Sequence, residues 1–157
     1  MSPNPSTAIP TPYEDLLREP HVGLALDPEW RLQPGGQHMV QVGSVEASEV
    51  NEVAQWLAGI VQEDELPQKV LILHQFSVDM IPDREAIDAS VPEVAMVVHA
   101  DGHGTRDLKL GTWEALKKDL PEGMRMAWKN FYDEDTPTWT PEETFDNDPK
   151  PWFVSYQ

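Results

Sequence analysis

Short apolar runs recur along the chain, and polar or ionisable residues follow each of them. The runs cover residues 22–26, 69–75, 94–99, 125–131 and 152–156. Runs of this length that are apolar almost throughout are typical of strands buried on both faces of a parallel sheet. The carboxyl ends of parallel strands meet at one edge, where α/β proteins bind their ligands. The polar residues after the runs are therefore predicted to gather at one site.

Helical patterns separate several of the predicted strands. A short helix is predicted over residues 13–19, with Thr11 as its N-cap. Apolar residues at helical spacing predict the clearest helix, which begins at a cap formed by Ser44 or Ser48 and ends near Glu65. A further helix is predicted over residues 113–120, and one helical turn over residues 83–87. Five parallel strands of this kind can form either an open doubly wound sheet or part of a barrel.

Two loops and a leader complete the predicted organisation. Residues 31–43 form a loop long enough to overhang the end of the first strand, and residues 133–151 form an acidic loop. Residues 1–12 carry four prolines and are predicted to be a flexible leader to a domain over residues 13–157. The first six residues lack the basic region and apolar core of a signal peptide, so none is expected.

Composition and charge exclude several classes of function. The net charge of −17 argues against nucleic acid and against an anionic membrane surface as partners. No apolar stretch approaches the roughly 20 residues of a membrane-spanning helix, so no membrane insertion is expected. The absence of cysteine excludes disulfides and thiolate chemistry. No glycine-rich turn follows the first strand, which gives a dinucleotide no support, and no cofactor is expected.

Five of the strand-end segments together resemble a known family. They are Leu26-Asp27-Pro28-Glu29-Trp30, Leu73-His74-Gln75-Phe76, His99-Ala100-Asp101-Gly102, the run from Trp128 to Pro137, and Phe153-Val154-Ser155-Tyr156-Gln157. In this order they are similar to a family of actinobacterial exported proteins of glycoside-hydrolase-like (β/α)8-barrel type, some of them lipoproteins. The resemblance implies an α/β fold, a partial (β/α) TIM-type barrel of about five parallel strands with flanking helices.

A partial barrel raises the question of closure. A complete barrel needs about 250 residues and eight strands, so this chain resembles the C-terminal part of one. Two sheet edges are then left unpaired. We expect them to be closed by self-association or by a partner, or the chain to be a truncated relic of a longer ancestor.

The predicted catalytic residues are carboxylates and a histidine at strand ends. Glycosidases use two carboxylates around the scissile bond, and Asp27 and Glu29 are candidates for this acid/base pair. The alternative for Asp27 is a tight turn in which it caps local backbone amides. His99 and Asp101 are the other two catalytic candidates, because a histidine at a strand tip can act as a general base.

The predicted substrate-binding residues share an aromatic face or a hydrogen-bonding group near a strand end. They are Trp30, His74, Gln75, Trp128, Lys129, Asn130, Tyr132 and Tyr156. Aromatic faces stack on the apolar faces of sugars, and His74, His99 and Asn130 are expected to hold substrate hydroxyls. Lys129 can balance an acid, orient a hydroxyl or form a Schiff base, or it can pair with a carboxylate between barrel layers. Strand alternation points Lys129 and Phe131 to one face and Trp128, Asn130 and Tyr132 to the other.

Three functional hypotheses follow. The leading one is a glycoside-hydrolase-like or carbohydrate-binding partial barrel with a carbohydrate ligand. The second is a non-catalytic barrel fragment that self-associates or binds a partner through its exposed face. The third is a metal-dependent hydrolase that uses His74, His99 and an aspartate.

Overall fold

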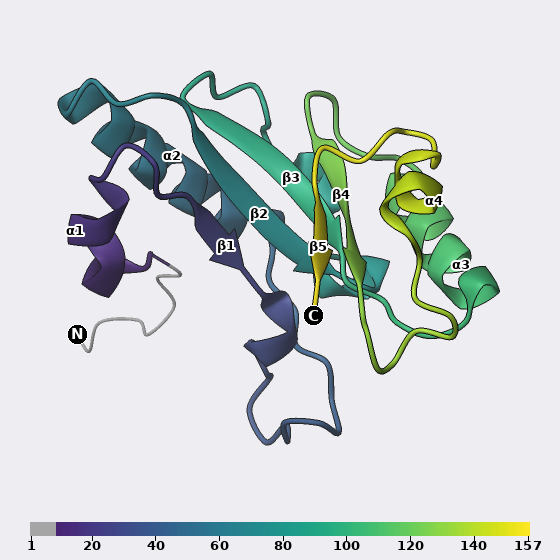
Figure 1. Ribbon diagram of the computed structural model, residues 1–157. Helices are drawn as coiled ribbons and strands as arrows, with labels where there is room; N and C mark the ends of the chain where they lie inside the picture. Colours follow the sequence, from purple (N-terminus) through teal and green to yellow (C-terminus); the bar gives the residue numbers. More distant parts are fainter. Residues whose placement is uncertain (1–8) are drawn as a thin grey trace.

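A single five-stranded parallel sheet, curled into a half-barrel, organises the molecule (Figure 1). The computed structural model describes residues 9–157. The strands are β1 (Leu24–Leu26), β2 (Lys69–Gln75), β3 (Val94–Ala100), β4 (Arg125–Asn130) and β5 (Val154–Tyr156). Each strand pairs in parallel with the next one along the chain, as strands do in a (β/α) barrel. The predicted fold class, a partial α/β barrel, is confirmed.

Helices cover the outer side of the sheet. The α-helices are α1 (Glu14–Leu17), α2 (Ala47–Glu63), α3 (Arg106–Lys117) and α4 (Pro141–Phe145). Four short 3-10 turns are also present. The turn η1 (Thr11–Tyr13) precedes α1, η2 (Pro28–Trp30) follows β1, and η3 (Val78–Met80) and η4 (Arg84–Ala86) lie between β2 and β3. In Figure 1, α2 lies behind β1 to β3, and α3 and α4 lie beside β4.

The two faces of the sheet bury different residues. Leu71 and Leu73 of β2 belong to one hydrophobic cluster with Val53 and Leu57 of α2, so these strand positions face the helices. The intervening positions face the inside of the half-barrel. There the register pairs Ile72 with Val97 and His74 with His99. Because side chains alternate along a strand, this register decides which polar residues reach the inner face.

The first two predicted helices begin and end differently from the sequence pattern. Thr11 is not an N-cap but the first residue of η1, and only Glu14–Leu17 is α-helical. Neither Ser44 nor Ser48 caps α2. The Ala47 amide of α2 instead donates to the Asp83 carboxylate, 2.8 Å away, in a segment 36 residues further along. A long-range contact of this kind cannot be identified from local spacing.

The later elements include two larger differences. Helix α3 begins at Arg106, seven residues before the predicted start, and Thr105 caps it by accepting from the Leu108 amide. The predicted loop 133–151 contains α4, which begins at a capping box between Thr140 and Glu143. Strand β5 starts two residues later than predicted. Most of the predicted leader, residues 1–8, lies outside the described residues.

Candidate functional site

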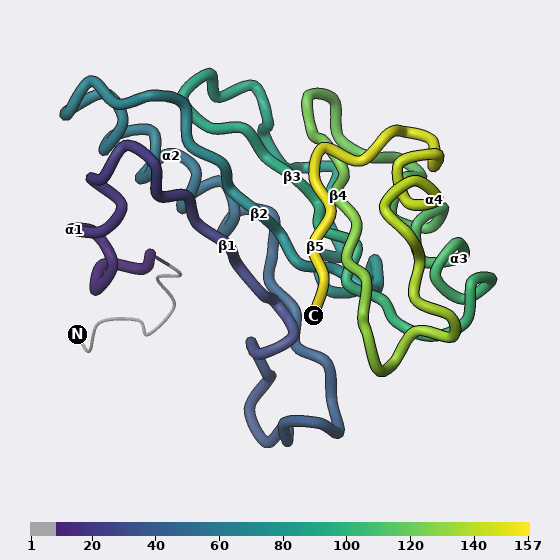
Figure 2. The backbone as a smooth tube through the Cα atoms, viewed as in Figure 1, coloured from purple at the N-terminus to yellow at the C-terminus, as the bar shows by residue number. Residues whose placement is uncertain are grey.

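A cleft of about 670 Å³ lies at the carboxyl ends of the strands. Three carboxylate side chains line it, Asp27, Glu29 and Asp101, together with one ammonium group, Lys129. Its other walls are largely aromatic or apolar: Trp30, Met39, Phe76, His103, Leu108 and Phe131. In Figure 2 the backbone of the 31–43 loop extends outward from the end of β1, beside this edge of the sheet. The edge predicted from the strand ends is therefore where a cleft is found.

Asp27 shapes the turn that begins the cleft wall. Its Oδ1 accepts a hydrogen bond from the Glu29 amide, and its Oδ2 accepts one from the Trp30 indole, each at 3.1 Å. Asp27 thus caps the turn η2, as the structural alternative predicted, while also lining the cleft. The Trp30 side chain is held by its indole N–H and is 53% exposed, so much of its ring faces outward.

Glu29 sits in surroundings that favour its protonated form. Burial raises the pKa of its carboxyl above the ordinary value, and the negative charges of Asp27 and Asp101 raise it further. The positive charge of Lys129 acts in the opposite direction, and the net pKa shift is upward. A carboxyl group that keeps its proton to higher pH is suited to act as a general acid.

Asp101 is held in its ionised form. Each oxygen of its carboxylate contacts a different side chain. Oδ1 lies 3.0 Å from Lys129 Nζ, and Oδ2 lies 3.2 Å from His74 Nδ1. Burial raises the pKa of the Asp101 carboxyl, but the hydrogen bonds from His74 and Lys129 outweigh it, so the net shift is downward. The predicted pairing of Lys129 with a carboxylate is thereby observed.

His99 lies beside His74 and is shielded from solvent. Its ring centroid is 4.9 Å from that of His74, and its Nε2 lies 2.9 Å from the Ser155 hydroxyl. Burial, followed by the nearby His74, lowers the pKa of His99 to about 4, so its imidazole is neutral at neutral pH. His99 is 5% exposed and is absent from the cleft lining. Its position is that of a supporting residue below the cleft.

Three predicted substrate-binding residues point away from the cleft. Gln75 is buried on the helix-facing side, where its amide oxygen accepts from Arg84. Trp128 packs its ring against Trp113 in the core. The Trp128 indole donates to Asn130, which is also buried. Within β4 the predicted alternation is correct: Trp128 and Asn130 share the core face, and Lys129 lines the cleft. Tyr132, which was predicted to share the face of Trp128, lies beyond the strand and is exposed.

Tyr132 and Tyr156 form a separate pair at the edge of the sheet. Their rings stack with centroids 5.4 Å apart, and neither lines the cleft. The Tyr156 hydroxyl donates to the Trp139 carbonyl, which fixes its direction. The structure therefore brings together Asp27, Glu29, Trp30, Asp101 and Lys129, with His74 and His99 alongside.

Sequence reasoning missed a second buried ion pair next to the cleft. Lys109 of α3 and Asp135 of the segment after β4 approach to 3.0 Å. Asp135 falls in the predicted acidic loop over residues 133–151, and Lys109 falls outside the helix predicted over residues 113–120. The signal that was available is the helical spacing of Lys109 from Trp113 and Leu116, which places this lysine on the buried face of α3.

Neither a metal cluster nor a membrane-spanning helix is found among residues 9–157. No group of three or more His, Asp or Glu side chains within these residues has an arrangement that could hold a metal ion. No helix in the same range is long and apolar enough to cross a membrane.

Comparisons with protein-family models, with curated proteins and with solved structures found no match to this chain.

Proposed function

We propose that this protein is a glycoside-hydrolase-like enzyme in which Glu29 is the general acid and Asp101 the ionised carboxylate. The observation that carries the proposal is a cleft lined by two carboxyl groups in different environments, Glu29 beside other carboxylates and Asp101 in contact with Lys129 and His74. The Glu29 pKa is raised by burial and by neighbouring carboxylates, whereas the Asp101 pKa is lowered through His74 and Lys129. Two carboxyl groups whose environments separate their pKa values are the arrangement that glycoside hydrolysis requires.

Each group then has one role in the reaction. Protonated Glu29 gives its proton to the glycosidic oxygen as the bond from that oxygen to the anomeric carbon breaks. Ionised Asp101 stabilises the positive charge that develops on the sugar, and it either attacks the anomeric carbon or removes a proton from the attacking water. Lys129 and His74 keep Asp101 ionised and oriented. Water supplies the hydroxyl group of the released sugar. If Asp101 attacks the anomeric carbon, the ionised Glu29 then removes a proton from this water and is protonated again; if Asp101 removes that proton itself, it releases it to solvent and Glu29 regains a proton from solvent.

The walls of the cleft suit a sugar. The exposed ring of Trp30 offers an aromatic face, and the carboxylates offer hydrogen-bond acceptors for hydroxyl groups. The resemblance of five strand-end segments to exported glycoside-hydrolase-like barrels agrees with this assignment, and membership of that family is part of the proposal.

The test is hydrolysis of a glycan panel by the wild-type chain and by two substituted chains. Glu29→Gln and Asp101→Asn each replace a titratable carboxyl group with an uncharged amide of nearly the same size. Exposed Glu122→Gln, in the turn before β4, is the matched control. We expect Glu29→Gln to lower kcat by about 10²- to 10⁴-fold, the contribution typical of a general acid. The configuration of the first product, followed by NMR, then shows whether Asp101 acts as nucleophile or as base.

The rate of hydrolysis is expected to fall at both high and low pH. Activity needs Glu29 protonated and Asp101 ionised, so the rate falls as pH rises through the Glu29 pKa and as pH falls through the Asp101 pKa. Glu29→Gln is expected to abolish the alkaline limb. Equal turnover by wild type, Glu29→Gln and Asp101→Asn would contradict the proposal, and glycan binding without turnover would reduce it to carbohydrate binding.

A further inference from the structure

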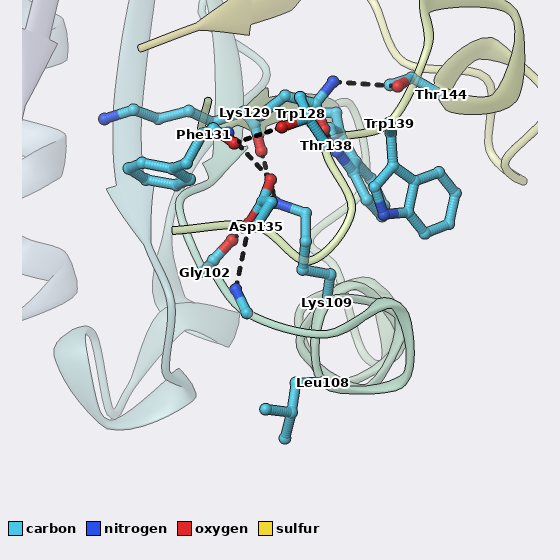
Figure 3. A network of polar contacts seen from close by, with 12 residues as sticks. Gly102, Leu108, Lys109, Trp128, Lys129, Phe131, Asp135, Thr138, Trp139 and Thr144 are labelled. Atoms are coloured by element: carbon cyan, nitrogen blue, oxygen red, sulfur yellow. Dashed lines mark hydrogen bonds and ion pairs between the residues drawn. The ribbon is translucent and has the colours of Figure 1, made fainter. Parts of the chain in front are cut away.

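The ion pair between Lys109 and Asp135 lies near the ion pair between Lys129 and Asp101 and is more deeply buried. Figure 3 shows the Lys109 side chain extending toward Asp135. Lys109 Nζ and Asp135 Oδ2 are 3.0 Å apart, and their side chains are 2% and 0% exposed. Burial lowers the pKa of Lys109, and the hydrogen bond and charge of Asp135 oppose that shift. Both ammonium groups lie near the ring of Phe131, with Lys109 Nζ 5.4 Å and Lys129 Nζ 4.8 Å from its centroid.

The ammonium group of Lys109 bonds directly to the backbone of the site. Besides Asp135, it donates to the carbonyl of Gly102 at 2.9 Å and to the carbonyl of Lys129 at 2.8 Å. An ammonium has three N–H donors, and each has a partner here. Gly102 directly follows Asp101, and Lys129 is the residue whose side chain contacts Asp101. Lys109 therefore links the backbone next to Asp101 with the backbone of Lys129, the two residues whose side chains form the contact.

Asp135 completes the same connection from the other side. Its Oδ1 accepts from the Gly104 amide at 3.0 Å, and its Oδ2 accepts from the Phe131 amide at 2.9 Å. The Thr136 amide donates to the Gly104 carbonyl at 3.1 Å. The segment after β3 and the segment after β4 are thus bonded to each other through one buried carboxylate.

We propose that Lys109 and Asp135 are positioning residues that hold Asp101 and Lys129 in contact. A buried ion pair is a weak source of net stability, because desolvation offsets the attraction between the charges. Such a pair can still fix geometry when every donor and acceptor is bonded, as in this network. Its predicted consequence for hydrolysis rests on the proposed function, whereas its consequence for the Asp101 carboxyl does not.

The test measures the titration of the Asp101 carboxyl by carbon-13 NMR. The double variant Lys109→Met/Asp135→Asn removes both buried charges together, so it leaves neither one unpaired. Asp135→Asn alone, which keeps an acceptor oxygen, is measured in parallel. The matched control is Lys69→Met, because Lys69 is also 2% exposed and donates to the carbonyls of Glu19 and Val22, at the opposite ends of the strands.

We expect the Asp101 pKa to rise toward its ordinary value in the double variant and in Asp135→Asn, and to stay low in Lys69→Met. An unchanged Asp101 titration in both Asp135 variants would overturn the proposal. An equal rise in Lys69→Met would also overturn it, because the Asp101 pKa would then follow general loss of stability rather than the contacts of Lys109.

Hydrolysis gives a second readout that separates this proposal from the proposed function. Misplacement of catalytic groups by about 1 Å costs roughly 10²-fold in rate. The double variant is therefore expected to lose about 10²-fold in kcat with little change in KM, whereas Lys69→Met keeps the wild-type kcat. If wild type hydrolyses no glycan, the proposed function fails, and the titration of Asp101 still decides whether Lys109 and Asp135 position it.

Discussion

At the scale of single residues, the inner face of the half-barrel combines a neutral histidine with charged groups. His99 is buried beside His74 and shares a hydrogen bond with the Ser155 hydroxyl. Its pKa of about 4 means that the folded protein resists its protonation. An unfolded chain exposes the same imidazole to water, where its pKa is about 6.5. This difference links the stability of the fold to pH.

Stability is predicted to fall between about pH 6.5 and pH 4 because of His99. In this range the unfolded state binds the proton and the folded state does not, so lowering the pH favours unfolding. The loss attributable to His99 is about 3 kcal/mol at the acid end of the range. His99→Gln removes the titrating group and should flatten this part of the pH dependence, as measured by urea unfolding at several pH values. A variant whose stability falls as steeply as that of wild type would refute the assignment.

The residues of the cleft could be predicted from the sequence only in part. Asp27, Glu29, Asp101 and Lys129 all follow or end apolar runs, and parallel strands place such residues at one edge. The face toward which Asn130 points could not be predicted. Alternation separates it from Lys129, but a strand buried on both sides carries apolar residues on both, so the pattern does not mark the core face.

At the scale of elements, β4 and α4 are joined by a buried chain of polar side chains. The Trp128 indole donates to the Asn130 side-chain oxygen at 2.8 Å, and the Asn130 amide donates to the Thr144 hydroxyl at 3.0 Å. Thr144 in turn donates to the carbonyl of Thr140, the N-cap of α4. A helix of five residues has little stability by itself, so its position depends on such contacts and on its capping box.

Asn130→Ala is predicted to destabilise the protein without weakening glycan binding. It leaves the buried Trp128 indole without its acceptor, which costs about 1–3 kcal/mol in the free energy of unfolding. Thr144→Val removes the other partner, and the two substitutions should be coupled in a double-mutant cycle measured by urea unfolding. Asn147→Ala is the control, because Asn147 donates only within the α4 region. Weaker glycan binding at unchanged stability would instead make Asn130 a ligand contact.

The start of α3 and the whole of α4 are not predicted by the sequence pattern, for different physical reasons. The first half of α3 carries Arg106, Asp107 and Lys109, and its buried face includes the charged Lys109, so apolar periodicity begins only later. In α4 the signal was present, since Thr140 and Glu143 have the spacing of a capping box, but five residues are too few to show a periodic pattern. The long helix α2 has eight buried residues at helical spacing, so its sequence pattern predicts it.

At the scale of the whole molecule, the half-barrel formed by residues 9–157 has two open edges. Strands β1 and β5 are the outer strands of the sheet formed by the described residues, and each has three residues. Unpaired edge strands favour pairing with another chain. We propose that a second copy closes the sheet, with β5 of each copy beside β1 of the other. The net charge of −17 on each copy opposes this contact, so association should strengthen as salt screens the repulsion.

Val154 offers a direct test of closure through the β5 edge. The Phe153 carbonyl accepts from the Trp128 amide, and the Gln157 amide donates to the Asn130 carbonyl, so these two positions, each an odd number of residues from Val154, bond to β4. Alternation of the ladder then turns the Val154 N–H toward the open edge. Val154→Pro removes this donor, while Val154→Ala removes two methyl groups from the side chain and keeps the N–H. Light scattering should give about twice the 17.7 kDa chain mass for wild type and Val154→Ala, and the single-chain mass for Val154→Pro. A wild-type chain that stays monomeric at high salt would leave the half-barrel open, and the cleft would then have to act within one copy.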